Sequence, residues 1–484
     1  MKKITFTIVS LIVLLSGCGG GGGGEPTSAL SPAAPDATPA AAPPAASTPP
    51  AAAAPPVATA VAPAVAQRAD DGDIDDAAVL TQPDEPSATD SDDTVEEGGS
   101  ADFAFADYAL AHLAANLQDA GEGTDLGAPV QTAASASRPT LYVSTTGSDS
   151  NPGTSRSPLR SIAKAARAAK PGTRIMVAPG SYSGGFRTTV DGTAAARISF
   201  VSSAKWGARI VPPRSSPNRV AWDNRGDYVD IIGFDVDGSK YQGGTRWARG
   251  IYNGGSHVSV RNNLVHHVAQ DIGCDGRGGA GIGMDSYYGG VKADVISNLV
   301  HDIGPAGCRF VQGIYISTSG RVKNNVVYRV AAAAIHLWHD AHDVIITNNT
   351  VSGSTTGIIV GGGNFYHSSK GADQVAVYSN IVYDNVRGIS EQGKTGKNNT
   401  YRNNLVYQNS SYDWSLKNGL THTGTVSAPP QFLAYARSSK PNLKLTAASP
   451  AIGRATPLHA ESTDFEGKPR NAAVGYDIGA YQHR

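Results

Sequence analysis

The chain has 484 residues with 40 basic and 41 acidic side chains, so its net charge is only −1. The charges are unevenly divided, because residues 1–137 hold 3 basic and 19 acidic side chains and residues 138–484 hold 37 and 22. The Gly, Ala and Pro tracts and acidic runs before residue 138 exclude a packed core there, whereas the basic remainder is expected to attract polyanions.

The first 17 residues predict an export signal. Lys2 and Lys3 precede an apolar run from Ile4 to Leu15, which is shorter than the roughly 20 residues of a membrane span. Residues 15–18, Leu-Ser-Gly-Cys, resemble the lipobox of bacterial lipoproteins. This resemblance implies cleavage after residue 17, a lipid on Cys18 and, because Gly19 is not Asp, the outer membrane. An ordinary signal peptide is the alternative.

Residues 18–137 are expected to be a disordered linker, with one short helical island at Phe103–Leu117. The protein would then be an outer-membrane lipoprotein that faces the periplasm or the cell surface. Its only membrane contact would be the N-terminal lipid. We expect a monomer.

The domain at 138–484 opens with a strand at residues 141–144, a turn-rich loop and a helix. Ser157 and Pro158 are expected to begin the helix, which places Leu159, Ile162, Ala163 and Ala166 on one face. A second strand at 175–177 ends in Pro-Gly-Ser-Tyr at 179–182. This order resembles the N-terminal cap of right-handed parallel β-helix proteins, including pectate-lyase-like polysaccharide lyases, and implies an all-β solenoid with a short capping helix.

An internal repeat favours the same fold. Each repeat has an Asn followed by apolar residues, with steps of 35, 27, 24, 31 and 24 residues. Stacked at the strand spacing, these residues would form a ladder of hydrogen bonds, so we assign them to structure. The members are Asn263, Asn298, Asn325, Asn349, Asn380 and Asn404.

A second repeat series runs in phase with the Asn series. Its members are Ile251, Ile282, Ile314, Ile335, Ile358 and Ile389. Cys274 and Cys308 follow consecutive Asn positions by 11 and 10 residues, so they should stack, and an oxidising exterior permits a disulfide between them.

The last 55 residues resemble the C-terminal segment of many secreted β-helix proteins. We expect this segment to close the last open rung, which would otherwise expose a sheet edge. Asp464 and Arg470 are assigned to structure.

Strand alternation predicts which side chains face outward. If the Ile series points inward, Tyr315 and His336 face solvent on neighbouring rungs, with Asp285 and Trp338 two residues further along the same face. A Trp offers a sugar ring an apolar platform, while His and Tyr exchange protons.

The loop after Trp338 is rich in titratable groups. His339 and Asp340 are further catalytic candidates, whereas His342 and Asp343 precede a strand and are expected to be turn residues.

Several charged residues are candidates for binding substrate or metal. The basic residues in loops beside these rungs, which suit a uronate carboxylate, are Arg246, Arg249, Arg309, Lys370 and Lys394. Asp235 and Asp237 share an outward face and are candidate calcium ligands; calcium is the one cofactor expected. His266, His267 and His301 fall on another sheet, where packing is expected.

We therefore expect β-elimination on an acidic polysaccharide, with His336 as base and Tyr315 as acid, and Arg, Lys or calcium neutralising the carboxylate. Pectate lyases of this fold commonly use an Asp cluster beside a Lys or Arg, and the sequence has no clear counterpart. The alternatives are a hydrolase using Asp285 and Asp340, a uronate epimerase suggested by residues 340–343, and a non-catalytic polysaccharide-binding protein. An exported location argues against nucleic acid as the partner.

Overall fold

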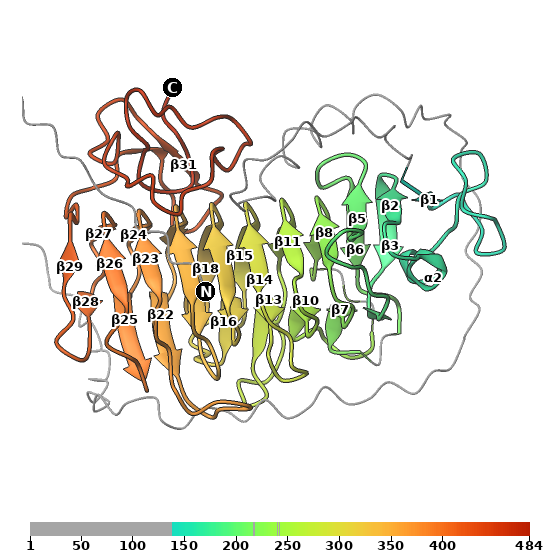
Figure 1. Ribbon diagram of the computed structural model, residues 1–484, viewed down its shortest axis with the longest axis horizontal. Helices are drawn as coiled ribbons and strands as arrows, with labels where there is room; N and C mark the ends of the chain where they lie inside the picture. Colours follow the sequence, from blue (N-terminus) through green and yellow to red (C-terminus); the bar gives the residue numbers. More distant parts are fainter. Residues whose placement is uncertain (1–137, 216–217, 240, 242) are drawn as a thin grey trace, which may run out of the picture. The chain divides into compact units, whose positions relative to one another are not determined.

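A computed structural model describes residues 138–215, 218–239, 241 and 243–484. Cys18, the signal and the linker lie outside these residues. The described chain coils into a right-handed parallel β-helix built on three long parallel sheets (Figure 1), which confirms the predicted fold class. Among the described residues, no helix has the length and apolar character needed to cross a membrane.

Sheet 1 has eleven strands and includes both ends of the solenoid. In spatial order they are β1 (Thr140–Val143), β2 (Arg174–Val177), β5 (Ile198–Ser202), β8 (Val229–Ile232), β11 (Ser259–Arg261), β14 (Ala293–Ile296), β17 (Gly320–Lys323), β20 (Val344–Thr347), β23 (Ala376–Tyr378), β26 (Thr400–Arg402) and β29 (His422–Thr423).

Sheet 2 has nine strands. They are β4 (Phe186–Thr188), β7 (Val220–Asn224), β10 (Arg249–Asn253), β13 (Gly279–Met284), β16 (Val311–Ile316), β19 (Ala333–Leu337), β22 (Thr356–Gly362), β25 (Arg387–Gly393) and β28 (Tyr412–Ser415).

Sheet 3 also has nine strands, which complete the rungs. They are β3 (Gly180–Ser183), β6 (Ala208–Val211), β9 (Asp235–Asp237), β12 (Leu264–His266), β15 (Leu299–Ile303), β18 (Val326–Val330), β21 (Thr350–Ser352), β24 (Ile381–Tyr383) and β27 (Leu405–Tyr407). Two antiparallel strands, β30 (Phe432–Ala434) and β31 (Asn442–Leu445), follow the solenoid.

The predicted Ile column fills the core of the solenoid. Ile282 pairs with Ile251 and Ile314 on the adjacent strands of sheet 2, and the register continues through Ile335, Ile358 and Ile389. All six side chains are fully buried. Burial of such apolar area is the main favourable contribution to folding.

The Asn ladder forms as predicted. At each step a backbone N–H donates to the next Asn Oδ1, as from Asn325 to Asn349 at 2.9 Å, and the side-chain amide donates to the same oxygen at 3.0 Å. The residue before a ladder Asn has a left-handed backbone, with φ of 55° at both Asn324 and Asn348. Asn tolerates this conformation well, which explains the Asn-Asn pairs.

The capping helix α2 is Ile162–Ala168, and it begins later than the sequence predicted. Ser161 is the N-cap, and its hydroxyl accepts a hydrogen bond from the N–H of Lys164. Asp149 explains the difference, because its carboxylate accepts the N–H groups of Arg160 and Ser161 and thereby fixes the segment before the helix. The expected start at Ser157 was wrong.

The disulfide between Cys274 and Cys308 is present, with Cα atoms 5.4 Å apart. It joins the loops that precede β13 and β16, which are adjacent strands of sheet 2. The stacking inferred from the Asn register is therefore confirmed.

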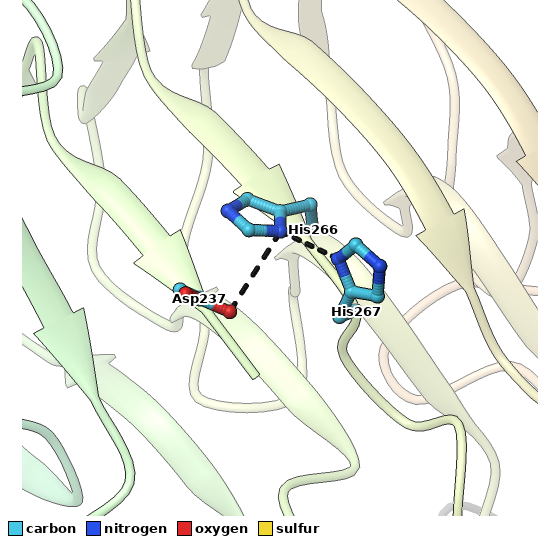
Figure 2. A group of neighbouring side chains, drawn as sticks. All are labelled: Asp237, His266 and His267. Carbon is cyan, nitrogen blue, oxygen red and sulfur yellow. Dashed lines mark hydrogen bonds and ion pairs between the residues drawn. The ribbon is translucent and has the colours of Figure 1, made fainter. Parts of the chain in front are cut away.

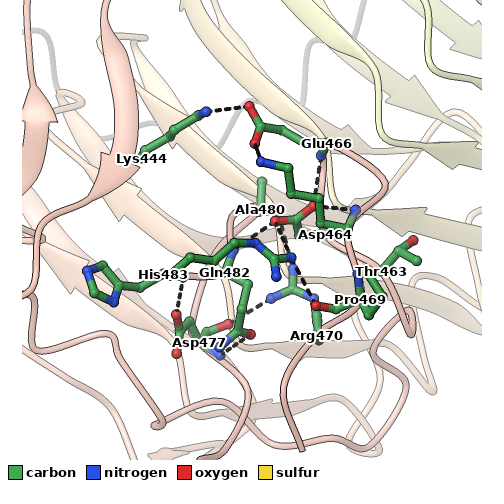
Figure 3. Close-up of polar contacts among 12 residues, drawn as sticks. Lys444, Thr463, Asp464, Glu466, Pro469, Arg470, Asp477, Ala480, Gln482 and His483 are labelled. Carbon is green, nitrogen blue, oxygen red and sulfur yellow. Dashed lines mark hydrogen bonds and ion pairs between the residues drawn. The ribbon is translucent and has the colours of Figure 1, made fainter.

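The C-terminal segment does not close the last rung but packs against the outer face of sheet 3 (Figure 1). Leu443 and Phe465 pack with Leu299 and Tyr328 of that sheet. Figure 3 shows the polar contacts inside the segment. The buried guanidinium of Arg470 donates to the carbonyl oxygens of Asp477, Gly479 and Ala480 and to Asn324 Oδ1. Burial lowers the pKa of Arg470 to about 10.

Candidate functional site

A cleft with an empty volume of about 920 Å³ lies on the outer face of sheet 2. Strands β10, β13, β16, β19, β22 and β25 all contribute to its lining. The predicted site residues that line it are Arg249, Asp285, Arg309, Tyr315, His336 and Trp338. Tyr315 and His336 are register partners on adjacent strands, as the repeat predicted.

His336 presents an unsatisfied nitrogen in the cleft. Its Nε2 is buried and has no hydrogen-bond partner among the described residues. Burial, followed by the nearby His339, lowers the pKa of His336 to about 3. The imidazole is therefore neutral at neutral pH and can accept a proton.

Tyr315 has the opposite protonation tendency. Burial, with the nearby Tyr366 and Asp285, raises the pKa of its phenol well above the usual value. The phenol thus stays protonated at neutral pH and has a proton to donate. Two neighbouring groups whose pKa values are pushed apart are typical of an acid and base pair.

Asp285 is held in place by three donors. Its Oδ2 accepts a hydrogen bond from the Tyr252 hydroxyl at 2.9 Å, and its Oδ1 accepts from the Ser317 hydroxyl at 2.7 Å and the Tyr287 N–H at 3.1 Å. The carboxylate is 4% exposed. These hydrogen bonds fix the orientation of the Asp285 carboxylate at the cleft.

Three guanidinium groups border the cleft. They belong to Arg249, Arg309 and Arg387. Within the described part of the chain, none of the three forms an ion pair with a carboxylate, whereas Arg209, Arg225 and Arg329, which do not line the cleft, do. Unpaired guanidiniums beside a cleft suit an anionic ligand.

Trp338 lies deeper than the sequence analysis predicted. The indole is 4% exposed, because a Cβ at Gly361, Gly363 or Gly393 would lie within 2.8 Å of it and these positions have none. Its Nε1 is buried without a partner among the described residues, as is Oε1 of Gln392. Trp338 thus forms the floor of the cleft and is not an exposed platform.

His339 and Asp340 do not line the cleft. The Asp340 carboxylate accepts the N–H groups of Tyr366, His367 and Ser368, from the loop that follows β22 (Figure 1). His339 contacts the same loop through Asn364 O and the Tyr366 hydroxyl, each at 2.7 Å. Both residues hold the loop, so a hydrolase that pairs Asp285 with Asp340 is not supported.

The predicted lysines lie in two loops that contact each other: Lys370 is in the loop after β22, and Lys394 follows β25. Lys394 Nζ donates to the carbonyl of Ser369, and neither Lys394 nor Lys370 lines the cleft. Arg246 pairs with Asp271 at 3.5 Å. His342 and Asp343 form an exposed pair at 2.6 Å, and none of residues 340–343, the stretch that suggested an epimerase, lines the cleft.

The predicted calcium ligands lie on a different sheet from the cleft. Asp235 and Asp237 belong to β9 of sheet 3 and are buried. Asp235 already pairs with Arg209 at 2.8 Å and with His266 at 2.9 Å. A cation bound to these two carboxylates would not reach a substrate in the cleft.

The lining residues that were not chosen as site candidates from the sequence include Tyr252, Arg387 and Gln392. Tyr252 falls in the outward column that contains Tyr315. Arg387 begins β25, and Gln392 is the register partner of Gly361 in that strand. The register of the Ile column identifies Tyr252, one residue after Ile251, and Gln392, three residues after Ile389, as outward-facing, whereas simple alternation would place Arg387 on the inward face with Ile389.

Three parallel sheets with a cleft along one of them define a right-handed parallel β-helix protein. The model of a family described as a protein of unknown function, DUF1565, matches residues 145–189, which span the cap. Pectate lyase L of Dickeya chrysanthemi is 26% identical over 353 residues, covering 60% of this chain and 77% of the lyase.

The chain also resembles solved structures. The crystal structure of pectate lyase Pel9A aligns with a TM-score of 0.46 at 16% identity, covering 72% of this chain and 97% of that one. The A-module of a mannuronan C-5 epimerase from Azotobacter vinelandii aligns with a TM-score of 0.35 at 15% identity, covering 54% and 68%.

Proposed function

We propose that the protein is a polysaccharide lyase that cleaves a uronate-containing polymer by β-elimination in the cleft of sheet 2. The observation that carries the proposal is the pairing of a neutral His336, whose Nε2 has no partner among the described residues, with a protonated Tyr315 beside three guanidiniums. Similarity to pectate lyase L supports the same class of substrate.

The chemistry needs three functions. A guanidinium of Arg249, Arg309 or Arg387 neutralises the uronate carboxylate and thereby acidifies the adjacent C5 proton. His336 Nε2 accepts that proton, and the electron pair forms the C4–C5 double bond as the C4–O bond breaks. The Tyr315 hydroxyl gives its proton to the departing glycosidic oxygen, and proton exchange with solvent then restores both groups.

Substrate binding would also adjust the base. A pKa of about 3 makes a buried imidazole a weak base. The polymer carries further carboxylates besides the one that a guanidinium neutralises, and their negative charge would raise the pKa of His336 toward the working pH. Because the guanidiniums are already in the cleft, the mechanism uses no calcium on Asp235 or Asp237.

The proposal is tested by incubating the full-length protein with polymers of galacturonate, of mannuronate and guluronate, and of glucuronate, with and without calcium. Ultraviolet absorbance measures the unsaturated uronate that elimination forms. We expect an increase with at least one polymer, and His336→Ala or Tyr315→Phe should reduce the rate by about 10²–10⁴-fold.

Matched variants control for indirect effects. His342→Ala and Tyr288→Phe remove an exposed imidazole and an exposed phenol hydroxyl outside the cleft and should leave the rate unchanged. New reducing ends without ultraviolet absorbance would indicate hydrolysis. Salt-sensitive binding without any product would indicate a polysaccharide-binding protein and overturn the lyase proposal.

A further inference from the structure

A second cluster of polar side chains lies on sheet 3 and has no residue in common with the lining of the cleft. It consists of Asp237, His266 and His267 (Figure 2), and their candidate ligand atoms lie within 4.8 Å of one another. The rings were expected to pack, and His266 does stack on His301 at 5.2 Å. Ring stacking does not explain why ring nitrogens of His266 and His267 and the carboxylate of Asp237 converge on one place.

The backbone brings the three side chains together. Asp237 and His266 are register partners on the adjacent parallel strands β9 and β12, so their side chains lie side by side on one face. His267 follows at the end of β12 with φ of 54°. This left-handed conformation breaks the alternation of a strand, so the ring of His267 lies beside that of His266 instead of entering the core.

Hydrogen bonding fixes which nitrogen of His266 is available. Its Nε2 lies 2.9 Å from Asp235 Oδ1, and the other oxygen of Asp235 pairs with Arg209 at 2.8 Å. A carboxylate held by a guanidinium accepts a hydrogen bond from the imidazole, so Nε2 carries the hydrogen and Nδ1 is the nitrogen with the lone pair. Carboxylates orient metal-binding histidines in the same way.

The Nδ1 lone pair of His266 faces two further donors of electron pairs. His267 Nδ1 is 2.6 Å away and hydrogen-bonds to it, so His267 becomes a ligand when its hydrogen moves to Nε2, and Asp237 Oδ1 is 3.8 Å away. Ligand atoms of a tetrahedral zinc site, bonded at about 2.0–2.1 Å, lie about 3.3 Å apart. These two distances would therefore need to change by roughly 0.5–0.7 Å to give zinc geometry, and the third, between Asp237 and His267, lies within 4.8 Å and would have to close to a similar value by side-chain rotation.

We propose that Asp237, His266 and His267 bind a divalent transition metal ion, best matched by Zn²⁺, with water as the fourth ligand. Two imidazoles and one carboxylate favour zinc over calcium, which takes oxygen ligands. The exposed fraction of the His266 side chain is 14%, so an ion can reach the site from solvent.

The neighbouring charged groups are consistent with this ligand set. Arg209 lies 4.0 Å from Asp237 but directs its shorter contact to Asp235, which compensates its charge. His301 and Asp302 lie next to His267. Asp302 already binds Arg329 through both oxygens, at 2.6 and 2.7 Å, and also His301 Nδ1 at 2.6 Å. Both residues are thus engaged and are not assigned as ligands.

The test uses the full-length protein after treatment with a chelator and dialysis. Zn²⁺ is titrated in competition with a chromogenic chelator, and bound metal per chain is measured by elemental analysis. We expect one Zn²⁺ per chain with an affinity that His266→Ala and His267→Ala each reduce at least 100-fold. Asp235→Asn should reduce it about 10–100-fold, because Asp235 only orients His266.

Two controls keep the result independent of folding and of catalysis. His342→Ala, at an exposed site away from the cluster, should leave zinc affinity unchanged, and circular dichroism must show that every variant is folded. X-ray absorption of the loaded protein should show two nitrogen ligands from imidazole. Binding that persists in His267→Ala, or no zinc uptake by the folded wild type, would overturn the proposal.

Discussion

The ring of Tyr315 meets the ring of His336 edge-on, with centroids 5.3 Å apart and an interplanar angle of 90°. The two residues pair in register across β16 and β19, so the sheet itself sets their separation. A donor and an acceptor fixed by a parallel ladder need little reorganisation before reaction, which is the advantage of building a site on strands.

Arg387→Ala is expected to weaken substrate binding more than turnover. The guanidinium borders the cleft and has no carboxylate partner among the described residues, so its removal deletes a contact with the polyanion while His336 and Tyr315 stay in place. We expect KM to rise about 10–100-fold, as for the loss of one charge-assisted hydrogen bond of roughly 1.5–3 kcal/mol.

Steady-state kinetics at two salt concentrations measures this effect. Arg167→Ala, on the exposed surface of α2, is the control and should leave KM unchanged. A drop in kcat at constant KM would place Arg387 in the chemical step instead.

Acid should destabilise the wild type through His336. Because burial lowers the pKa of His336 to about 3 in the folded protein, below its ordinary value, the unfolded chain binds the proton first as the pH falls. Stability is thus lost between about pH 6.5 and pH 3, by at most about 1.4 kcal/mol per pH unit. Urea unfolding at several pH values should show a shallower decline for His336→Asn, and equal slopes would contradict the burial argument.

Asn349→Ala is expected to destabilise the solenoid. The substitution removes the oxygen that accepts the buried backbone N–H of Asn325, and it removes the amide that donates to Val322 O at 2.8 Å. An orphaned buried donor costs roughly 1–3 kcal/mol. Chemical denaturation measures the loss, and Asn471→Ala at an exposed turn is the control, expected to change stability by less than about 0.5 kcal/mol.

Removal of the disulfide should lower stability without abolishing the fold. The bond closes a separation of 34 residues, and such links contribute about 2–4 kcal/mol. The double substitution Cys274→Ser with Cys308→Ser should therefore melt at a lower temperature than the oxidised wild type in calorimetry. Addition of a reductant should lower the melting temperature of the wild type and leave that of the double variant where it was.

The regular part of the molecule could be predicted from the sequence, because a solenoid repeats its constraints. The spacing of Asn263 and Asn298, together with the column that contains Ile282, fixed the register, and the register placed Tyr315 beside His336. Cys274 and Cys308 followed from the same alignment.

The irregular loops could not be predicted in this way. Asp340 resembles a catalytic residue in the sequence. Its carboxylate, however, accepts hydrogen bonds from backbone N–H groups that lie 26 to 28 residues later in the chain, in a loop that is not part of the repeat. The start of α2 was misplaced for a similar reason, because the Asp149 carboxylate acts on residues 11 and 12 positions away. Contacts of this kind depend on where a loop folds, which periodicity does not encode.

The outer face of sheet 3 can be covered only after the C-terminal segment has been synthesised. A solenoid can form rung by rung as it is synthesised, since each rung contacts mainly its neighbours. Arg470 and Thr463, however, bind the side chain of Asn324, which precedes them by 146 and 139 residues. The outer face of sheet 3 therefore stays uncovered until the last part of the chain has been made. A ribosome that stalls near the end would release a protein whose exposed apolar surface can bind unwanted partners.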